Sequence, residues 1–363
     1  DVSSFESESF GAGFNFGFPV TRRSQLSLRY RISQDTISIT DAPVVIDPTT
    51  GSLIPITIPQ LDADGNQLFD DDGNPLELAT FATPTTDPFP ENGVIVDQCD
   101  EVFLARDPIC LSERSELTSL LGYTFQWDGR NDPIAPTRGF DFSLSQDIAG
   151  LGGDVSFLRT EITGAAYRGL LPGIRASLRL SAGAIFDFSD EDTLRINNRF
   201  FRGGNNFRGF NVAGIGPRIS NFEVDDMGVP TGRVFRGNAL GGQAFYQGTL
   251  EITLPQVIPE QYGIRGALFI DAGALGVLED EVLFDPVFQA NVPNPAFGNE
   301  PNEEPTTNVI TRIEDDLNFR AAAGLSVFWD SPFGPIRFDF SQNIASEAFD
   351  RPRGFRFSTT TRF

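Results

Sequence analysis

Hydrophobic and polar residues alternate with a period of two along most of the chain. From Phe10 to Phe18 the even positions are Phe or Ala, and the odd positions are Gly or Asn. From Ile174 to Ala184 apolar residues alternate with Arg, Ser and Gly. This period is typical of β-strands that have one apolar and one polar face. It predicts eleven strands, at residues 8–18, 25–39, 115–128, 138–148, 156–169, 173–188, 242–254, 263–274, 317–330, 335–345 and 353–363.

The lengths of these strands and their polar faces separate two all-β architectures. Strands of a soluble β-sandwich also alternate, but they average about five or six residues, whereas roughly ten residues cross a bilayer when tilted. Several predicted strands have the longer length, and their polar faces carry Arg. An Arg that faces lipid at the bilayer centre costs about 2–4 kcal/mol. We therefore expect these faces to line a lumen, and the predicted fold class is an all-β transmembrane antiparallel β-barrel.

Short and long connections alternate between the predicted strands. The long ones cover about 40–115, 190–241 and 279–316. In bacterial outer-membrane barrels short turns face the periplasm and long loops face outward, so we expect these three segments to be extracellular. Such barrels have an even number of strands, and an open edge in lipid leaves backbone groups unpaired. Eleven strands therefore predict either that N-terminal strands precede residue 1, which the abrupt start favours, or that another chain closes the barrel.

Composition excludes several functional classes. The chain has 50 Asp and Glu against 27 Lys and Arg, and the net charge of −23 disfavours a nucleic-acid partner. It contains no His, and therefore no Ser-His-Asp or Cys-His catalytic site and no His-ligated zinc. No run approaches the roughly 18 apolar residues of a membrane-spanning helix. We expect neither an enzyme nor a resident cofactor.

Two weaker signals lie in the first long segment, 40–115. Cys99 and Cys110 are close together in a stretch rich in Pro and Asp, which favours one disulfide in an oxidising compartment over a metal site. Spaced oxygen-bearing side chains next to Gly form a weak calcium candidate, Asp62, Asp64, Asn66, Asp70 and Asp72. The EF-hand pattern needs Glu six residues after its Gly, but Asp71 stands there, and Asp-Gly is also a common hairpin turn. We therefore prefer a solvated hairpin to a calcium site.

A sequence string in the second long segment, 190–241, is a far more specific indicator of a protein family than the alternation with period two. Residues 199–210 read Arg-Phe-Phe-Arg-Gly-Gly-Asn-Asn-Phe-Arg-Gly-Phe, and Ile-Gly-Pro-Arg follows at 215–218. Further strings follow in order at 241–251, 263–273 and 329–338. Together they resemble the long loop and the succeeding strands of the BamA-type outer-membrane assembly family, in the bacterial surface antigen (D15) superfamily.

The resemblance implies a site in the lumen. In that family the loop folds back into the barrel, and the Arg of its motif pairs with acids on two neighbouring strands. Carried onto this sequence, the pairing joins Arg208 to Glu251 and Asp271. The period of two independently places both acids on polar faces, where they could instead neutralise lumen arginines of adjacent strands. The loop motif is Phe207, Arg208, Gly209 and Phe210. Its Gly would permit a tight turn, and its last Phe would anchor the loop.

The C-terminal strand carries a second family feature. Phe355, Phe357 and Phe363 lie on one face, which resembles the recognition signal of outer-membrane barrels. Thr360 is a departure from that signal, because Gly is often found at this position.

For function, the resemblance implies an integral protein of the bacterial outer membrane that inserts and folds other β-barrel proteins without ATP or covalent chemistry. The implied partners are unfolded barrel substrates, accessory periplasmic lipoproteins, and outer-membrane lipid and lipopolysaccharide. If the family's sixteen-stranded barrel applies, residues 1–363 cover about its sixth to sixteenth strands, and soluble periplasmic POTRA repeats precede them.

Two alternatives stay open. A two-partner secretion transporter, or a TamA-type relative, shares the barrel and the loop and would differ in its periplasmic domains. A passive porin would explain the alternation but not the ordered strings.

Overall fold

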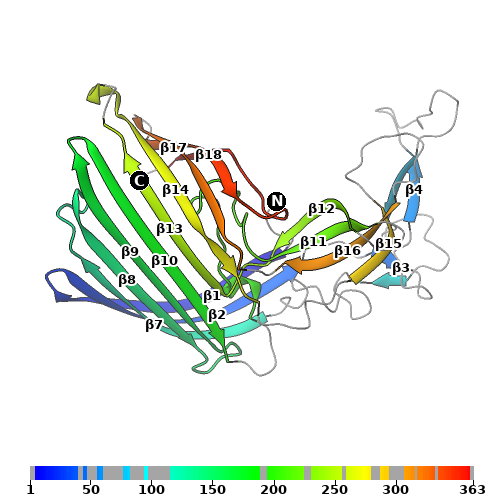
Figure 1. Cartoon of the computed structure of the whole chain (residues 1–363). Helices are drawn as coiled ribbons and strands as arrows, with labels where there is room; N and C mark the ends of the chain where they lie inside the picture. The colour runs from blue at the N-terminus through cyan, green and yellow to red at the C-terminus, as the bar shows by residue number, and fades with distance from the viewer. Residues whose placement is uncertain are drawn as a thin grey trace.

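Eleven strands form one antiparallel sheet, in which each strand pairs with the next strand of the sheet along the chain (Figure 1). The computed structural model describes residues 5–39, 44–46, 55–59, 77–81, 94–96, 115–188, 194–224, 230–255, 259–278, 287–293, 306–314, 317–331 and 334–359. The strands of the sheet are β1 (Phe5–Thr21), β2 (Ser24–Ile39), β7 (Ser115–Asp128), β8 (Arg138–Ala149), β9 (Phe157–Leu171), β10 (Ile174–Asp187), β13 (Ala244–Thr253), β14 (Ile264–Gly276), β17 (Arg320–Ser331), β18 (Gly334–Ala345) and β19 (Phe355–Thr359). The strands predicted from the period of two are confirmed in number and order. Within these ranges no helix has the length and apolar character needed to span a membrane.

The sheet is curved (Figure 1). Its concave face, which carries the polar contacts described next, is called the lumen below. On this face Arg29 of β2 donates to Asp147 of β8 at 2.7 Å. The same guanidinium donates to Thr124 and Ser145 at 2.6 and 2.8 Å. An arginine of the wall is therefore balanced by polar groups of neighbouring strands, which agrees with the high cost of turning that charge toward lipid.

The outer face of the sheet exposes large apolar side chains. Phe10 and Phe14 of β1 are 87% and 67% exposed, and Leu180 of β10 is 56% exposed. Such a continuous apolar belt would be unfavourable against water, but it is the surface that a barrel presents to hydrocarbon. The alternation along each strand thus separates a lipid-facing surface from a polar lumen.

The long connections contain short strands that the period of two did not predict. β11 (Arg218–Val224), β12 (Pro230–Ala239), β15 (Val287–Pro293) and β16 (Thr306–Glu314) form a separate sheet, in the order β12-β11-β16-β15. The second and third long connections are therefore joined through the β11–β16 pair. Two small antiparallel pairs lie in the first long connection, β3 (Val44–Ile46) with β6 (Val94–Val96) and β4 (Pro55–Pro59) with β5 (Glu77–Phe81). The four-stranded sheet projects beyond one end of the eleven-stranded sheet (Figure 1).

Several sequence predictions fall on positions that the structure does not describe. These are the disulfide residues Cys99 and Cys110, the calcium candidates Asp62, Asp64, Asn66, Asp70 and Asp72, and the terminal Phe363.

The larger buried apolar cluster lies between the lumen wall and residues 194–215 of the second long connection. That segment contributes Phe200, Phe207 and Phe210, which are at most 3% exposed. The wall contributes Phe245 of β13, whose ring meets the Phe200 ring edge to face at 4.7 Å. Burying a side chain of this size stabilises by about 1.5–3 kcal/mol. The fold therefore has its main apolar core inside the barrel, where a loop covers the wall.

Candidate functional site in the lumen

The second long connection folds back against the lumen before it leaves the barrel. A single 3-10 turn at Ile196–Asn198 starts this part of the chain. Isolated β-bridges then tie Phe200 to Gly242 and Phe210 to Pro352. The segment 194–217, called the lumen loop below, is thus attached by its backbone both next to β13 and to the connection between β18 and β19.

Arg208 holds the centre of the lumen loop against the wall. Its guanidinium makes a bidentate contact with Asp271 of β14, with Nε to Oδ2 at 2.7 Å and Nη2 to Oδ1 at 2.8 Å. Its Nη1 donates to Glu251 Oε2 of β13 at 2.7 Å, and its backbone N–H donates to Asp271 Oδ2 at 3.0 Å. The register opposes Thr249 to Asp271, so Glu251 lies two residues further along the lumen face of the adjacent strand. This is the geometry that a planar guanidinium needs for two carboxylates at once.

The Arg208–Asp271 pair is removed from solvent. The Arg208 side chain is 6% exposed and that of Asp271 is 2% exposed, whereas Glu251 is 24% exposed. The guanidinium also lies 3.6 Å from the centre of the Phe269 ring. Burial alone would lower the pKa of Arg208, but the hydrogen bonds and negative charges of Asp271 and Glu251 raise it above its ordinary value. Arg208 therefore keeps its positive charge, and the site offers a fixed charge contact.

Gly209 follows Arg208 in a conformation that a side chain would oppose. Its φ is +89°, in the left-handed region, and a Cβ built there would overlap the Cβ of Ala322 on β17. The carbonyl of Gly209 accepts a hydrogen bond from the backbone N–H of Arg353 at 2.8 Å. Close approach to the wall thus requires Gly at this position.

Phe207 and Phe210 flank the charge contact. Their rings meet edge to face at 5.4 Å, and each is 1% exposed. The two rings belong to the apolar cluster that covers the lumen wall. Water is excluded on this side of Arg208, which strengthens its interaction with Asp271.

Polar groups of β17 and β18 extend the contact. Arg208 Nη1 lies 3.4 Å from the Ser326 hydroxyl, and Arg337 of β18 lies 3.7 Å from Glu251. Arg337 also pairs with Asp339 at 2.8 Å. Arg337 and Asp339 share the polar face of β18, but nothing in the sequence joined them to the loop. The network therefore spans four consecutive strands of the wall.

Two further buried ion pairs lie near the ends of the lumen loop, and sequence reasoning missed both. Arg195 pairs with Glu116 of β7 at 3.2 Å and donates to the Asp35 carbonyl at 3.0 Å. Arg320 pairs with Asp350 at 3.1 Å, and both side chains are fully buried. Single charged residues this far apart in sequence leave no local pattern that would predict their pairing.

The whole chain, residues 1–363, matches the model of the Omp85 superfamily domain. The chain belongs to the Omp85 superfamily. The lumen loop and its Arg208 contact, which the resemblance had implied, agree with this assignment. A chain of this superfamily with this barrel fold is an integral outer-membrane protein.

Individual relatives agree with this family. The chain is 26% identical over 261 residues to the outer membrane protein assembly factor BamA of Neorickettsia risticii. It is 30% identical over 155 residues to the sorting and assembly machinery component 50 homolog of Bos taurus. These alignments cover 71% and 42% of this chain, but 29% of each relative, so the chain spans under a third of their length.

A solved structure shares the fold. The BamA of Haemophilus ducreyi lacking POTRA domains 1–3 superposes with a TM-score of 0.57 at 16% identity. The match covers 97% of this chain and 54% of that chain. The BamA-type barrel predicted from the sequence is thereby confirmed at the level of fold.

The last described strand of this Omp85 chain carries two of the predicted signal residues. Phe355 and Phe357 of β19 are 47% and 53% exposed on the outer face. Their rings lie 5.2 and 5.5 Å from those of Phe340 and Phe338 on β18. They form an aromatic surface that faces lipid.

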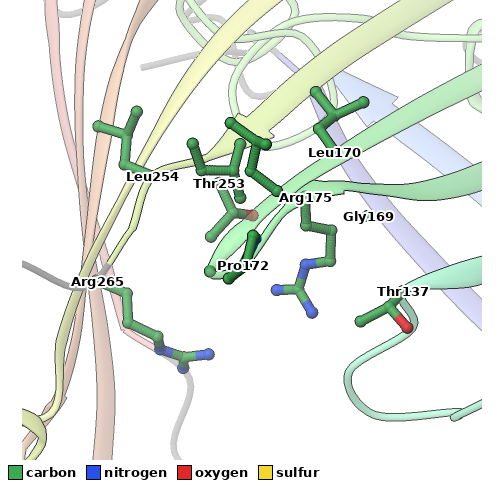
Figure 2. A pocket seen from close by; sticks show the side chains of 11 residues that line it. Thr137, Gly169, Leu170, Pro172, Arg175, Thr253, Leu254 and Arg265 are labelled. Carbon is green, nitrogen blue, oxygen red and sulfur yellow. The ribbon is translucent and has the colours of Figure 1, made fainter.

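A recess of about 580 Å³ lies at the end of the sheet that carries the short turns. Figure 2 shows Arg175 and Arg265 directed toward the same open space from β10 and β14. Arg265 pairs with the exposed Asp330 at 3.0 Å. This recess is separate from the lumen loop, and its arginines were predicted only as part of the polar faces.

Proposed function

We propose that this chain is the barrel portion of a factor that inserts and folds other β-barrel proteins in the outer membrane, without ATP or covalent chemistry. The observation that carries the proposal is the contact of Arg208 with Asp271 and Glu251. It occurs in a chain that matches the Omp85 superfamily over residues 1–363. The names of the BamA and sorting and assembly machinery relatives both describe assembly, which favours this function over export.

The match to the Omp85 superfamily over residues 1–363 favours assembly over passive diffusion, and the lumen loop is compatible with it. The loop lies against the lumen wall and is held there by a buried bidentate contact and an apolar cluster. A porin can also hold a loop inward, so the loop alone does not separate the two functions, but in an assembly factor it would stiffen the wall and leave the strand edges as the reactive part of the barrel. Incoming strands would then add to an edge by backbone pairing.

The partners follow from the same proposal. Unfolded β-barrel chains are the substrates, because only an unpaired strand can extend a sheet edge. Accessory periplasmic lipoproteins and lipopolysaccharide are further partners of such a machine.

The test uses the full-length protein reconstituted in liposomes. A urea-denatured barrel substrate is diluted into them, and its folding is followed by heat-modifiable gel mobility and by protection from protease. We expect faster folding than in liposomes that contain a porin of similar size. A correctly folded protein that gives no acceleration would rule the proposal out, and export of a passenger domain would assign the chain to the secretion branch.

A further inference from the structure

Two arginines lie directly opposite each other on the apolar outer face. Arg138 begins β8, Arg168 lies near the end of β9, and the register pairs them. Both are exposed. They share their face with the exposed Phe140 and Leu170, each 53% exposed, and not with the lumen network. Two arginine side chains therefore start from directly opposite positions at the edge of the lipid-facing belt.

Like charges at directly opposite positions of an antiparallel pair destabilise a sheet, because the Cβ atoms are only about 4.5–5.5 Å apart. An acid between them would remove that cost. In the described part of the chain, however, neither arginine has an ion pair. On β10 the residue opposite Arg168 is Ala176, which carries no charge.

The acids at this end of the sheet are engaged elsewhere. Asp128 and Asp141 both face Arg130, at 2.8 and 3.7 Å. Asp132 accepts the backbone N–H groups of the adjacent turn, and Asp330 pairs with Arg265. Among the residues that the structure describes, no acid pairs with Arg138 or Arg168, although the net charge of the chain is −23. A negative charge from outside the chain would remove the repulsion between the two arginines.

The position of Arg138 and Arg168 in the barrel indicates which molecule could supply a negative charge. The pair lies at the end of the sheet that carries the short turns, which in outer-membrane barrels is the periplasmic side. The Trp127 and Phe140 rings stack beside it at 4.2 Å, on the same outer face. Stacked aromatic rings at the rim of an apolar belt are typical of the level of the lipid headgroups. At this depth an Arg costs about 0–1 kcal/mol, so two can be retained.

We propose that Arg138 and Arg168 bind the phosphate of an anionic phospholipid in the periplasmic leaflet. Each guanidinium presents two parallel N–H groups, a geometry that suits phosphate oxygens. The acyl chains of the same lipid lie on the belt formed by Phe140, Leu170 and the leucines of β10. The lipid removes the repulsion between the two arginines and fixes the depth of this side of the barrel. The inference depends on the outer-membrane location and not on the assembly function.

The experiment is native mass spectrometry of the full-length protein in detergent, titrated with phosphatidylglycerol or with phosphatidylcholine of the same acyl chains. For R138Q/R168Q we expect about tenfold weaker phosphatidylglycerol binding at the tightest site, because two charge-assisted contacts are lost. Phosphatidylcholine binding should not change. The matched control is R22Q/R23Q, which removes two exposed arginines of the β1–β2 turn at the same end of the sheet.

Three results would overturn the proposal. They are unchanged phosphatidylglycerol binding in R138Q/R168Q, an equal loss in R22Q/R23Q, and an equal loss of phosphatidylcholine. If R138Q/R168Q does not fold, as judged by heat-modifiable mobility, the charge-conserving R138K/R168K provides the test. It keeps both charges but loses the planar fork, and we expect an intermediate loss of phosphatidylglycerol binding. Wild-type affinity in that variant would then refute the role of the guanidinium pair.

Discussion

Arg29 and Arg208 both face the lumen and both pair with an aspartate, yet their structural roles differ. Arg29 is part of the wall, and its partner Asp147 lies on a strand of the same sheet, with side chains 26% and 18% exposed. Arg208 comes from the lumen loop, and its partner Asp271 is 2% exposed. A wall pair neutralises charges that the strand order already brings together. The loop pair instead decides where a separate segment of the chain lies.

The difference predicts the largest effect at Arg208. R208A leaves the Asp271 carboxylate buried without its partner, and breaking such a buried pair costs about 3–5 kcal/mol. We expect the lumen loop to be cleaved by proteinase K under conditions in which the wild-type loop is intact, and we expect assembly of a substrate barrel to slow. A protected loop in R208A would show that the apolar cluster alone holds it.

Gly209 tests whether close approach to the wall is needed as well as charge. G209A places a residue in the left-handed region, at a cost of about 1–2 kcal/mol, and adds an overlap with Ala322. We expect partial protease sensitivity, weaker than in R208A. The double variant G209A/A322G relieves the overlap but not the backbone strain, so it should restore part of the protection. If G209A/A322G is as protease-sensitive as G209A, backbone strain alone would account for the effect of G209A.

A substitution at Glu251 tests the partly exposed partner of Arg208 independently of the buried partner, Asp271. E251Q keeps an acceptor for Arg208 Nη1 but removes a charge that is 24% exposed. We expect a loss of about 0.5–1.5 kcal/mol in loop stability, measured by the protease concentration needed for half cleavage. A loss as large as that of R208A would contradict the assignment of Asp271 as the main partner.

Arg29 gives the smallest expected effect and is the control for the others. R29Q breaks a partly exposed pair within the wall, and such pairs contribute about 1 kcal/mol or less. The thermal unfolding midpoint should fall slightly, and the lumen loop should stay protected. Cleavage of the loop in R29Q would mean that wall charges and loop docking are not separable.

The barrel wall could be predicted because lipid on one side and a polar lumen on the other impose the same alternation on every strand. The eleven strands and their order follow from that pattern. Strands β11 and β16 could not be predicted, because each is short and its partner lies in another long connection. Their alternation is not imposed by a bilayer.

The candidate site likewise contains contacts that the sequence predicted and contacts that only the folded structure shows. Family strings pointed to Arg208, Glu251 and Asp271, and the structure has them in contact. The Arg195–Glu116 and Arg320–Asp350 pairs form only after folding brings distant segments together, so no spacing rule marks them. Arg138 and Arg168 lay at the ends of predicted strands, where an Arg is easily taken for a turn residue. Only the register shows that they face each other.

The measurement that tests the loop contact most directly is a double-mutant cycle of R208A and D271A in the full-length protein. The free energy of loop opening is obtained from the rate of proteolysis in each variant. Close charge pairs in buried settings couple by about 1.5–7 kcal/mol, so we predict a coupling of at least about 2 kcal/mol. Losses that add to within about 0.5 kcal/mol would contradict the claim that Arg208 holds the loop through Asp271.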